Sequence, residues 1–374
     1  MINQVCHIIT SLNDGGAEAV LYRLCSYEKT TRHHVISLMD EGKYGPLLQE
    51  MGVKVTCLNM PQGKITVFGL WKLWCILRNE RSDVIQTWMY HANFIGGVLA
   101  RLAGAKKIFW GIHHTTLDSN KRSTFYVAKL CAWLSTLVPT GIVCCAQKSL
   151  EVHRDLGYVA HKLFVIPNGY DLNRFSFDAK ARQSLRTQWG VGEKLLLGMV
   201  SRFDPQKDHK NLLTALARLK HQNNDFYAVL VGNGLDEENR QIKEWLVALG
   251  LTDNIRLLGR RNDIPDVMSA LDVHVLSSSS GEAFPNVVAE AMACETPVVV
   301  TDVGDAATIV GDTGWVVPPK SADMLANALL KAREAMQDTD AWQMRCTAAR
   351  QRVENNFSLQ RMVEGYKHVW SVDK

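Results

Sequence analysis

The sequence predicts an α/β fold made of two doubly wound parallel-sheet domains that face each other across a cleft. Short, continuous apolar runs rich in Val, Ile and Leu alternate with longer segments of helical period, as expected for parallel strands covered by helices on both faces. These runs form two sets, of seven and six. The chain has 374 residues, and a single core stops growing near about 250–300 residues, so two domains are expected.

The predicted strands and the domain boundary can be read along the chain. Strands are expected at 5–11, 34–39, 53–58, 84–88, 107–111, 141–145 and 163–166, and then at 195–201, 227–231, 255–258, 273–276, 298–301 and 315–317. The turn-forming tripeptide Pro167-Asn168-Gly169 follows the seventh strand. We therefore expect one domain at 1–168 and a second at 169–355. A C-terminal helix at 356–374 could cross back to the first domain.

Composition narrows the class of protein. At 47% hydrophobic and 21% charged residues, the chain is too apolar for a disordered protein. Nine cysteines, an odd number without a C-x-x-C pair, indicate reduced thiols in a cytoplasmic protein and no zinc site. Residues 130–147 carry no charge, but Pro139 and Gly141 interrupt them, so a helix followed by a strand is predicted there instead of a membrane span.

The charge is distributed unevenly. Residues 1–168 hold 18 Lys+Arg against 11 Asp+Glu, whereas residues 169–374 hold 24 against 27. This asymmetry suggests that the two halves meet different partners.

The most informative stretch follows the predicted strand at 273–276. A loop of small residues leads to Glu282, and Phe284-Pro285-Asn286 then opens a predicted helix that contains Glu290. Pro285 suits a first helical turn, and the amino end of that helix can hold phosphate. A carboxylate accepts two adjacent sugar hydroxyls. The alternative is that both glutamates are surface charges.

Two further loops of the second domain follow predicted strands. Arg202 and Lys207 lie five residues apart across a turn, where paired cations would offset the charge of a diphosphate. The sequence Gly232-Asn233-Gly234 lets the backbone approach a ligand closely, although an ordinary turn would use the same residues. It is not a dinucleotide-binding fingerprint, because Glu237 stands where the third glycine would be.

In the first domain, Gly15 and Gly16 enter a predicted helix and can form an anion-binding turn. His113 and His114 end one strand, and His91 follows another. A histidine at such a position can orient a hydroxyl or donate to a developing charge. Imidazoles on a surface loop are the alternative.

These motifs together resemble the family-4 retaining glycosyltransferases of the two-Rossmann GT-B architecture. The resemblance rests on GGAE at 15–18, IHHT at 112–115, IPNGYDLNRF at 166–175, SRFDPQKDHKNLL at 201–213, GNG at 232–234, the two glutamates around FPN, and residues 301–319. The motifs occur in the family's order and extend from Gly15 to Pro319. One departure is Ala283, where many relatives have glycine, and it leaves the fit to the donor open.

The resemblance implies roles for the donor side. Glu290 matches the glutamate that binds the nucleotide ribose, and Glu282 the one that binds the donor sugar. Arg202 and Lys207 match the pair that holds the diphosphate, with Gly16 on the glycine turn beneath it. Gly232, Asn233, Phe284, Pro285 and Asn286 complete the donor-binding set.

The resemblance also implies a catalytic set of His114, Arg202, Lys207 and Glu282. His114 matches the histidine near the transferred sugar. His113 is the second choice for that role, and His91 is a further acceptor-side candidate. The reaction would run on one face of the sugar, without an enzyme nucleophile, a metal or another cofactor. The sole D-x-D motif, Asp338-Thr339-Asp340, is interpreted as a loop in the helical tail.

The expected function is transfer of a hexose or N-acetylhexosamine from a nucleotide sugar, with UDP as the expected nucleotide, to a lipid-linked saccharide in surface polysaccharide biosynthesis, such as lipopolysaccharide. The helical segment at 67–81, with Trp71, Trp74, Leu70 and Leu77 beside basic residues, suggests peripheral binding to the inner face of the cytoplasmic membrane. A crossover helix that packs on a sheet is the stronger alternative for this segment taken alone, and the positive charge of residues 1–168 favours the membrane. No nucleic acid is expected as a partner. A nonhydrolysing sugar-nucleotide epimerase and a non-catalytic nucleotide-sugar-binding protein remain alternatives.

Overall fold

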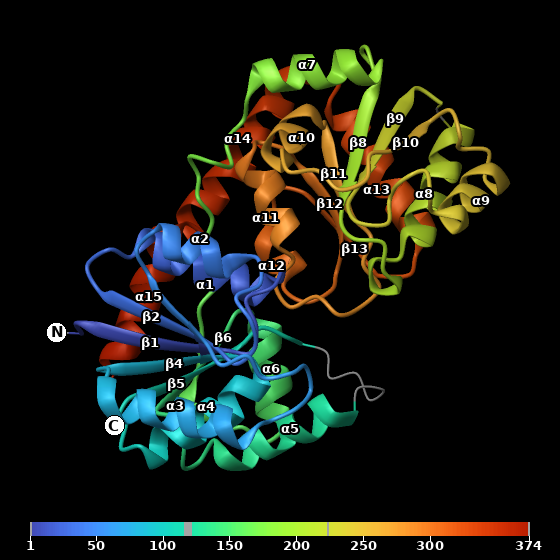
Figure 1. Ribbon diagram of the computed structural model, residues 1–374. Helices are drawn as coiled ribbons and strands as arrows, with labels where there is room; N and C mark the ends of the chain where they lie inside the picture. The colour runs from blue at the N-terminus through green and yellow to red at the C-terminus, as the bar shows by residue number, and fades with distance from the viewer. Residues whose placement is uncertain (1, 116–121, 223, 373–374) are drawn as a thin grey trace. The chain divides into compact units, whose positions relative to one another are not determined.

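The computed structural model describes residues 2–115, 122–222 and 224–372 (Figure 1). It divides into two compact units, one formed by Met1–Gly169 with Leu359–Lys374 and the other by Tyr170–Ser358. The chain therefore leaves the first unit one residue after the expected boundary at 168. It returns at Leu359, three residues after the expected start of the C-terminal helix.

The first unit is built on a parallel sheet, which has seven strands in the described residues. The strands are β1 (Gln4–Ile9), β2 (Arg32–Ser37), β3 (Lys54–Cys57), β4 (Val84–Trp88), β5 (Ile108–Ile112), β6 (Gly141–Cys144) and β7 (Leu163–Val165). Their order in the sheet is β3-β2-β1-β4-β5-β6-β7, so the direction of winding reverses between β1 and β4. The central strands β1, β4, β5 and β6 are buried almost throughout, which explains their apolar sequences, whereas the edge strand β3 is only partly buried.

Helices cover both faces of this sheet. On one face lie α1 (Gly16–Tyr27), α2 (Tyr44–Glu50) and α15 (Leu359–Ser371), which contribute to one apolar core. On the other lie α3 (Val67–Glu80), α4 (Tyr90–Leu102) and α5 (Arg122–Leu134), which contribute to a second core (Figure 1). Helix α6 (Gln147–Asp155) and the 3₁₀ turn η1 (Ala160–Lys162) connect β6 to β7.

The second unit repeats this plan with a parallel sheet that has six strands in the described residues. They are β8 (Leu195–Val200), β9 (Phe226–Val231), β10 (Ile255–Leu257), β11 (Val273–Leu276), β12 (Val298–Thr301) and β13 (Trp315–Val317). The sheet order is β10-β9-β8-β11-β12-β13, and winding reverses between β8 and β11.

The helices of the second unit also form two layers. Helices α8 (His209–Gln222), α9 (Arg240–Ala248) and α13 (Ala322–Ala335) share one core with the sheet. The remaining elements are α7 (Ala179–Trp189), η2 (Pro205–Lys207), α10 (Ile264–Ala270), α11 (Asn286–Ala293), α12 (Ala306–Val310) and α14 (Thr339–Asn356). Helix α14 packs against α11, and α10 packs against α7.

The predicted fold class is confirmed, and each of the thirteen predicted strands has a counterpart whose ends lie within two residues of the prediction. The uncharged stretch at 130–147 forms the end of α5 and then β6, as expected. In the part of the chain that the structure describes, no helix has the length and apolar character needed to cross a membrane.

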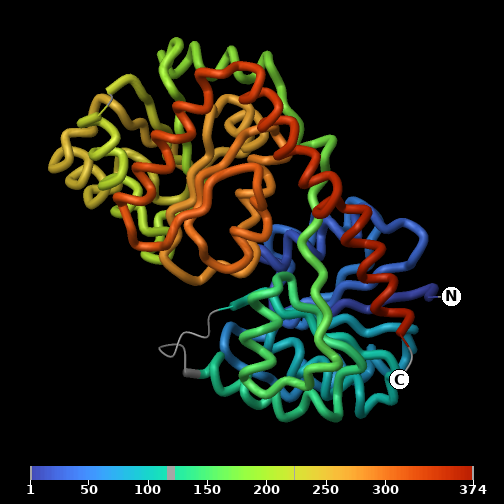
Figure 2. The backbone as a smooth tube through the Cα atoms, turned by 180° about the vertical axis from the view of Figure 1, so that it is seen from behind, coloured from blue at the N-terminus to red at the C-terminus, as the bar shows by residue number. Residues whose placement is uncertain are grey.

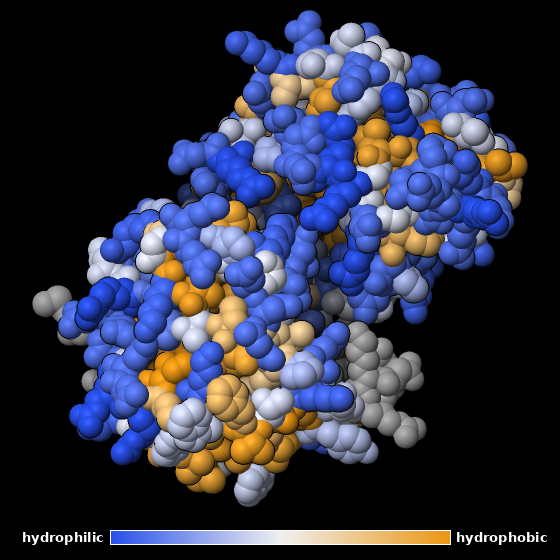
Figure 3. All heavy atoms as spheres, viewed as in Figure 1, coloured by the Kyte–Doolittle hydropathy of each residue, from blue (hydrophilic) through white to orange (hydrophobic). Residues whose placement is uncertain are grey.

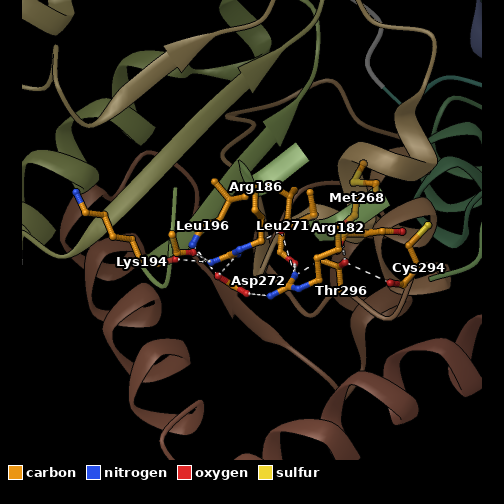
Figure 4. Close-up of polar contacts among 12 residues, drawn as sticks. Arg182, Arg186, Lys194, Leu196, Met268, Leu271, Asp272, Cys294 and Thr296 are labelled. Atoms are coloured by element: carbon orange, nitrogen blue, oxygen red, sulfur yellow. Dashed lines mark hydrogen bonds and ion pairs between the residues drawn. The ribbon is translucent and has the colours of Figure 1, made fainter. Parts of the chain in front are cut away.

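A buried carboxylate ties α7 to the second sheet (Figure 4). Asp272, 5% exposed, lies just before β11 and forms ion pairs with Arg182 and Arg186 of α7. It also accepts a hydrogen bond from the Leu196 backbone N–H at 2.7 Å. Arg182 donates to three carbonyl oxygens of the preceding turn, the nearest being that of Leu271 at 2.8 Å. The buried charge is therefore both paired and hydrogen-bonded, which offsets its desolvation cost.

The last helix fastens the C-terminal segment to the first unit (Figure 2). Trp370 of α15 is 1% exposed, and its indole N–H donates to the Gln86 side-chain oxygen on β4 at 3.0 Å. Tyr366 packs against both Trp370 and Trp88. Lys367 forms an ion pair with Glu28, which follows α1. The first core is thus completed by residues that lie at the far end of the sequence.

Candidate active site

The strand orders identify where each unit can hold a ligand. In open α/β sheets, ligands bind outside the carboxyl ends of the strands where the direction of winding reverses. In the second unit this position is set by the segments that follow β8 and β11. In the first unit it is set by the segments that follow β1 and β4.

The segments after β8 and β11 bring Lys207 and Glu282 together, although 75 residues separate them in the sequence. The Lys207 ammonium lies 2.5 Å from Oε1 of Glu282, and the two side chains are only 16% and 12% exposed. The Ser278 hydroxyl donates to the same oxygen at 2.6 Å. A half-buried cation and carboxylate therefore meet at the reversal point, where diphosphate and hydroxyl groups could be bound.

Hydrogen bonds fix these two loops to each other. The Ser279 N–H donates to the Gln206 carbonyl at 2.8 Å, and the Ser277 hydroxyl donates to the Lys207 carbonyl at 2.8 Å. Arg202 is the exposed member of the predicted cation pair, with a side chain 61% exposed, and its Nε lies 3.1 Å from an Asp204 oxygen. Lys207 is thus held in place, whereas Arg202 extends toward solvent.

Two glycines permit close backbone contacts around the loops. Gly232 has φ 146°, and a Cβ there would lie 1.8 Å from the Ser201 carbonyl oxygen. Gly304, with φ 62°, would place a Cβ 2.5 Å from the Glu282 carbonyl oxygen. The Asn233 carbonyl accepts a hydrogen bond from the Phe203 N–H at 2.8 Å. The GNG turn therefore supports the Arg202 loop, since only glycine fits beside Ser201.

The segment that opens α11 differs from the prediction in two details. Pro285 is the residue that precedes the helix, and Asn286 is its first residue, so Pro285 does not lie in the first turn. The Phe284 ring is 6% exposed and packs against Tyr170 and Phe357, so its side chain is part of the core. A donor would therefore contact the backbone at Phe284.

The first helical turns of α11 present polar groups. The Tyr170 hydroxyl donates to the Asn286 side-chain oxygen at 2.5 Å, which links the start of the second unit to this helix. Glu290 lies one turn further along α11 and is partly buried. Each of the predicted donor residues in the second unit therefore belongs to, or supports, the segments after β8, β9 and β11.

In the first unit, the glycine turn after β1 has the predicted position. Gly15 caps α1 and Gly16 is its exposed first residue. The Glu18 side chain folds back over this turn, because a Cβ on Gly15 would lie 2.3 Å from its carboxylate oxygen. The Ser11 hydroxyl also donates to Glu18 at 3.3 Å. An anion bound by the backbone of this turn would lie close to the Glu18 carboxylate, so the two negative charges would compete for the same position.

The histidines at the carboxyl ends of the strands have different environments. The His113 ring stacks on the buried Trp88 at 5.3 Å, and its Nε2 is buried without a hydrogen-bond partner. Burial lowers the pKa of His113 to about 3, so its ring is neutral near pH 7. His114 is exposed, its ring stacks on Tyr90 at 6.3 Å, and its carbonyl accepts from Ser149. Of the two histidines, His114 is therefore the one whose side chain is accessible from the surface.

His91 lies in the first turn of α4, at the reversal point between β1 and β4. It is partly buried, and that burial lowers its pKa. Met89, which precedes α4, has φ 72°, a conformation that costs free energy for a residue with a side chain. Backbone strain of this kind is concentrated at functional sites.

Comparison with known families gives the two units an assignment. Residues 14–174 match the model of Glycosyltransferase Family 4, and residues 181–345 match that of Glycosyl transferases group 1. The chain is a glycosyltransferase of the GT-B fold. The two matches correspond closely to the two structural units.

Individual relatives of this glycosyltransferase are similar over most of its length. It is 27% identical to an Escherichia coli UDP-Gal:alpha-D-GlcNAc-diphosphoundecaprenol alpha-1,3-galactosyltransferase, over 80% of this chain and 77% of the relative. It is 24% identical to the putative glycosyltransferase EpsF of Bacillus subtilis, over 80% and 79%. The structure of Anabaena HepE in complex with UDP superposes with a TM-score of 0.87 at 24% identity, covering 98% and 99% of the two chains.

The glycosyltransferase also contains one group of three potential metal ligands within the described residues. Atoms of His7, Cys25 and His33 lie within 4.8 Å of one another, all buried. The Trp88 indole donates to Nδ1 of His7 at 3.3 Å, and Nε2 of His7 lies 2.9 Å from Nδ1 of His33. Because Nδ1 of His7 accepts, its Nε2 carries the proton and donates to His33. This tautomer leaves His7 no lone pair for a metal.

Two residues that organise the predicted donor loops of this glycosyltransferase were not predicted from its sequence. Ser278 was included only in a run of small residues, and its bond to Glu282 depends on how the loop folds. Gly304 is 22 residues from Glu282, and only the positive φ and the close contact reveal its role. The prediction of a loop at Asp338-Thr339-Asp340 is wrong. Asp338 caps α14, and Thr339 and Asp340 are the first two residues of that helix.

Proposed function

We propose that this glycosyltransferase moves a hexose or N-acetylhexosamine from a UDP sugar to a lipid-linked saccharide, with retention of configuration, in surface polysaccharide biosynthesis. The observation that carries the proposal is the contact between Lys207 and Glu282 at the winding reversal of the second unit. It provides a cation for a diphosphate and a carboxylate for sugar hydroxyls side by side.

Donor binding changes the partners of this pair. In the structure, the Lys207 ammonium is paired with Glu282. A diphosphate carries more negative charge than a carboxylate, so Lys207 would pair with the diphosphate oxygens. The Glu282 carboxylate would then accept hydrogen bonds from hydroxyls of the sugar. Arg202, which extends into solvent 61% exposed, adds a second cation to the diphosphate. Glu290, in α11, supplies the acceptor for the ribose hydroxyls.

The proposed transfer takes place on one face of the sugar. The bond between sugar C1 and the diphosphate oxygen breaks, and the acceptor oxygen bonds to C1 from the same face. The acceptor hydroxyl proton passes to the departing diphosphate oxygen, so no enzyme nucleophile is needed. Lys207, Arg202 and the amino end of α11 stabilise the charge on the leaving group, and His114 of the first unit acts near the sugar.

The relatives support the substrate classes. The Escherichia coli relative carries UDP-Gal and a diphosphoundecaprenol-linked sugar in its name, and HepE has been solved with UDP and with UDP-glucose. We therefore place UDP-hexoses first among the donors and a lipid diphosphate saccharide first among the acceptors. With that acceptor, the enzyme works at the inner face of the cytoplasmic membrane.

We also propose that the transfer needs no metal, because Lys207, Arg202 and the α11 amino end supply positive charge for the diphosphate. Activity should persist in EDTA at the rate measured with added Mg²⁺ or Mn²⁺. A loss of activity in EDTA that Mn²⁺ restores would contradict this part of the proposal.

The test is transfer from UDP-galactose, UDP-glucose and UDP-N-acetylglucosamine to undecaprenyl-diphosphate-linked N-acetylglucosamine in detergent. The expected product is a disaccharide whose new linkage has the donor's α configuration by NMR. A β linkage would refute retention. Epimerised donor without transfer would support an epimerase, and binding of UDP sugar without consumption would support a non-catalytic protein.

A further inference from the structure

Large apolar side chains are exposed in one region of the first unit. Fifteen large apolar residues are exposed within the described part of the chain, and nine of them fall between residues 65 and 137. This region comprises α3, α4 and α5, which cover a single face of the sheet, with α4 packed against both of its neighbours. Apolar side chains gather over these helices at the lower edge of the molecule in Figure 3. Such clustering marks an interaction site.

On α3 the exposed residues are in the first turns. Val67, Phe68 and Trp71 are 84%, 68% and 61% exposed, and the Phe68 and Trp71 rings are 6.1 Å apart. Trp74, expected from the sequence to contact a membrane, is only partly exposed and has the Arg78 guanidinium 5.9 Å from its ring. The accessible aromatic surface therefore lies at the amino end of α3.

Helix α5 adds a second apolar stripe. Tyr126, Leu130 and Trp133 are exposed at spacings of four and three residues, which place them on one face of the helix, and Leu137 follows. Tyr126 and Trp133 are each 67% exposed. The opposite face of α5 is buried in the core. The exposed stripe therefore lies on the face of α5 that points away from this core.

The same segment holds the whole charge excess of the first domain. Residues 60–138 contain ten Lys+Arg against three Asp+Glu, whereas the remaining residues of 1–168 contain eight of each. Lys64 and Lys129 are exposed beside the apolar residues. A surface that combines aromatic residues with cations complements an anionic lipid bilayer, where Trp and Tyr favour the headgroup level. The same excess would repel a second copy of the chain.

We propose that the outer face of α3 and α5, formed by Phe68, Trp71, Tyr126 and Trp133 with the flanking lysines, docks onto an anionic lipid bilayer. This inference rests on the proposed function in one respect: docking would bring the enzyme to a lipid-linked acceptor. The aromatic rings enter the headgroup region, and the cations meet lipid phosphates. Binding therefore has an apolar part and a part that falls with salt.

The experiment is sedimentation of the full chain with vesicles of phosphatidylcholine and phosphatidylglycerol in equal parts, and with phosphatidylcholine alone. We expect binding to the anionic vesicles that weakens as salt rises. The double variant Trp71→Ala/Trp133→Ala should bind roughly tenfold more weakly, and Lys64→Ala/Lys129→Ala should lose part of the salt-sensitive binding. The matched controls are Tyr27→Ala, an exposed aromatic on the opposite face of the sheet, and Lys331→Ala on α13.

Several outcomes would overturn the inference. They are absence of vesicle binding by the wild-type chain, equal loss in the control variants, or a dimer that the tryptophan variant dissociates. Transfer from UDP sugar to a detergent-solubilised acceptor is measured on the same variants, with circular dichroism to verify folding. Loss of docking with intact transfer supports the docking surface, whereas docking without any transfer refutes the proposed function and leaves the surface in place.

Discussion

At the scale of single residues, the donor site depends on a charge pair that the fold assembles. Lys207 and Glu282 form an ion pair, and the Ser278 hydroxyl donates a hydrogen bond to the same carboxylate. A mostly buried cation without a partner would be costly, and the ion pair with Glu282 offsets that cost and holds the Lys207 side chain in position. Electrostatic preorganisation of this kind is a large term in catalysis.

Lys207→Ala should lower kcat/KM for the donor about 10²–10³-fold, because it removes the cation held for the leaving diphosphate. Steady-state kinetics and UDP binding by calorimetry measure the effect. The control is Lys210→Ala, an exposed lysine three residues later on α8, which should retain the wild-type rate. Equal activity in both variants would remove Lys207 from the site.

Glu290→Ala should likewise weaken donor use with the fold intact.

His114→Ala should lower kcat by about 10²-fold with little change in donor affinity, because the role proposed for this exposed ring is in turnover and not in donor binding. His113→Ala should chiefly reduce stability, by about 0.5–1.5 kcal/mol for the lost stack on Trp88. Kinetics, donor titration and thermal unfolding separate the two. A wild-type rate for His114→Ala would shift the role to another residue.

At the scale of elements, the active-site loops are positioned by turns that follow buried strands. The loop after β8 is held by the GNG turn after β9, and the loop after β11 is held by the segment after β12. The close approach of Gly232 to Ser201 leaves no room for a Cβ. The shape of the donor site is therefore determined by contacts between backbones of neighbouring connections.

Gly232→Ala should displace the Ser201–Arg202 segment and weaken both stability, by about 1–3 kcal/mol, and donor affinity. The contact that causes this is the 1.8 Å approach of the added Cβ to the Ser201 carbonyl oxygen. Gly250→Ala is the matched control, since it also has a positive φ of 64° but no atom within 4 Å of the added Cβ. It should lose stability from backbone strain alone and keep its donor affinity. Equal UDP affinity in both variants would argue against the role of the GNG turn.

At the scale of the whole molecule, each unit has its own core, and α15 completes the first one. Trp370→Ala should destabilise the first unit by about 3–5 kcal/mol, because it empties a buried site and leaves the Gln86 side chain without its donor. Trp133→Ala, at 67% exposure, is the control and should change stability by no more than about 0.5 kcal/mol. Denaturant unfolding followed by fluorescence measures both. A small loss for Trp370→Ala would show that the core repacks.

Stability should also fall in mild acid. Burial lowers the pKa of His33, His153 and His209 to about 4 and that of His274 to about 3, against 6.5 for an ordinary histidine. The unfolded chain therefore binds more protons between these values. The titration of these histidines leaves the free energy of unfolding unchanged above about pH 6.5. The free energy of unfolding decreases as pH falls from there toward 3–4, by about 1.4 kcal/mol per pH unit for each histidine. Thermal unfolding between pH 7.5 and pH 5 tests this, and a constant Tm would contradict it.

The fold class, the strands and the loops proposed to bind the donor could all be predicted from the sequence alone. Continuous apolar runs are a local property of buried parallel strands, and loops after such strands lie at one edge of a sheet. The sequence also located the basic half of the chain. What it left open was which side chains of a segment are accessible, as between His113 and His114 or between Trp71 and Trp74.

The accessibility of these side chains, and the contacts between distant residues, depend on how the elements pack together. The contact of Lys207 with Glu282, whose carboxylate also accepts a hydrogen bond from Ser278, joins residues 75 positions apart in the sequence. The return of Trp370 to β4 and the common face of α3 and α5 also depend on packing across long separations. The physical reason is that periodicity reports which face of an element is apolar, whereas its partner and the residues left exposed depend on the rest of the fold.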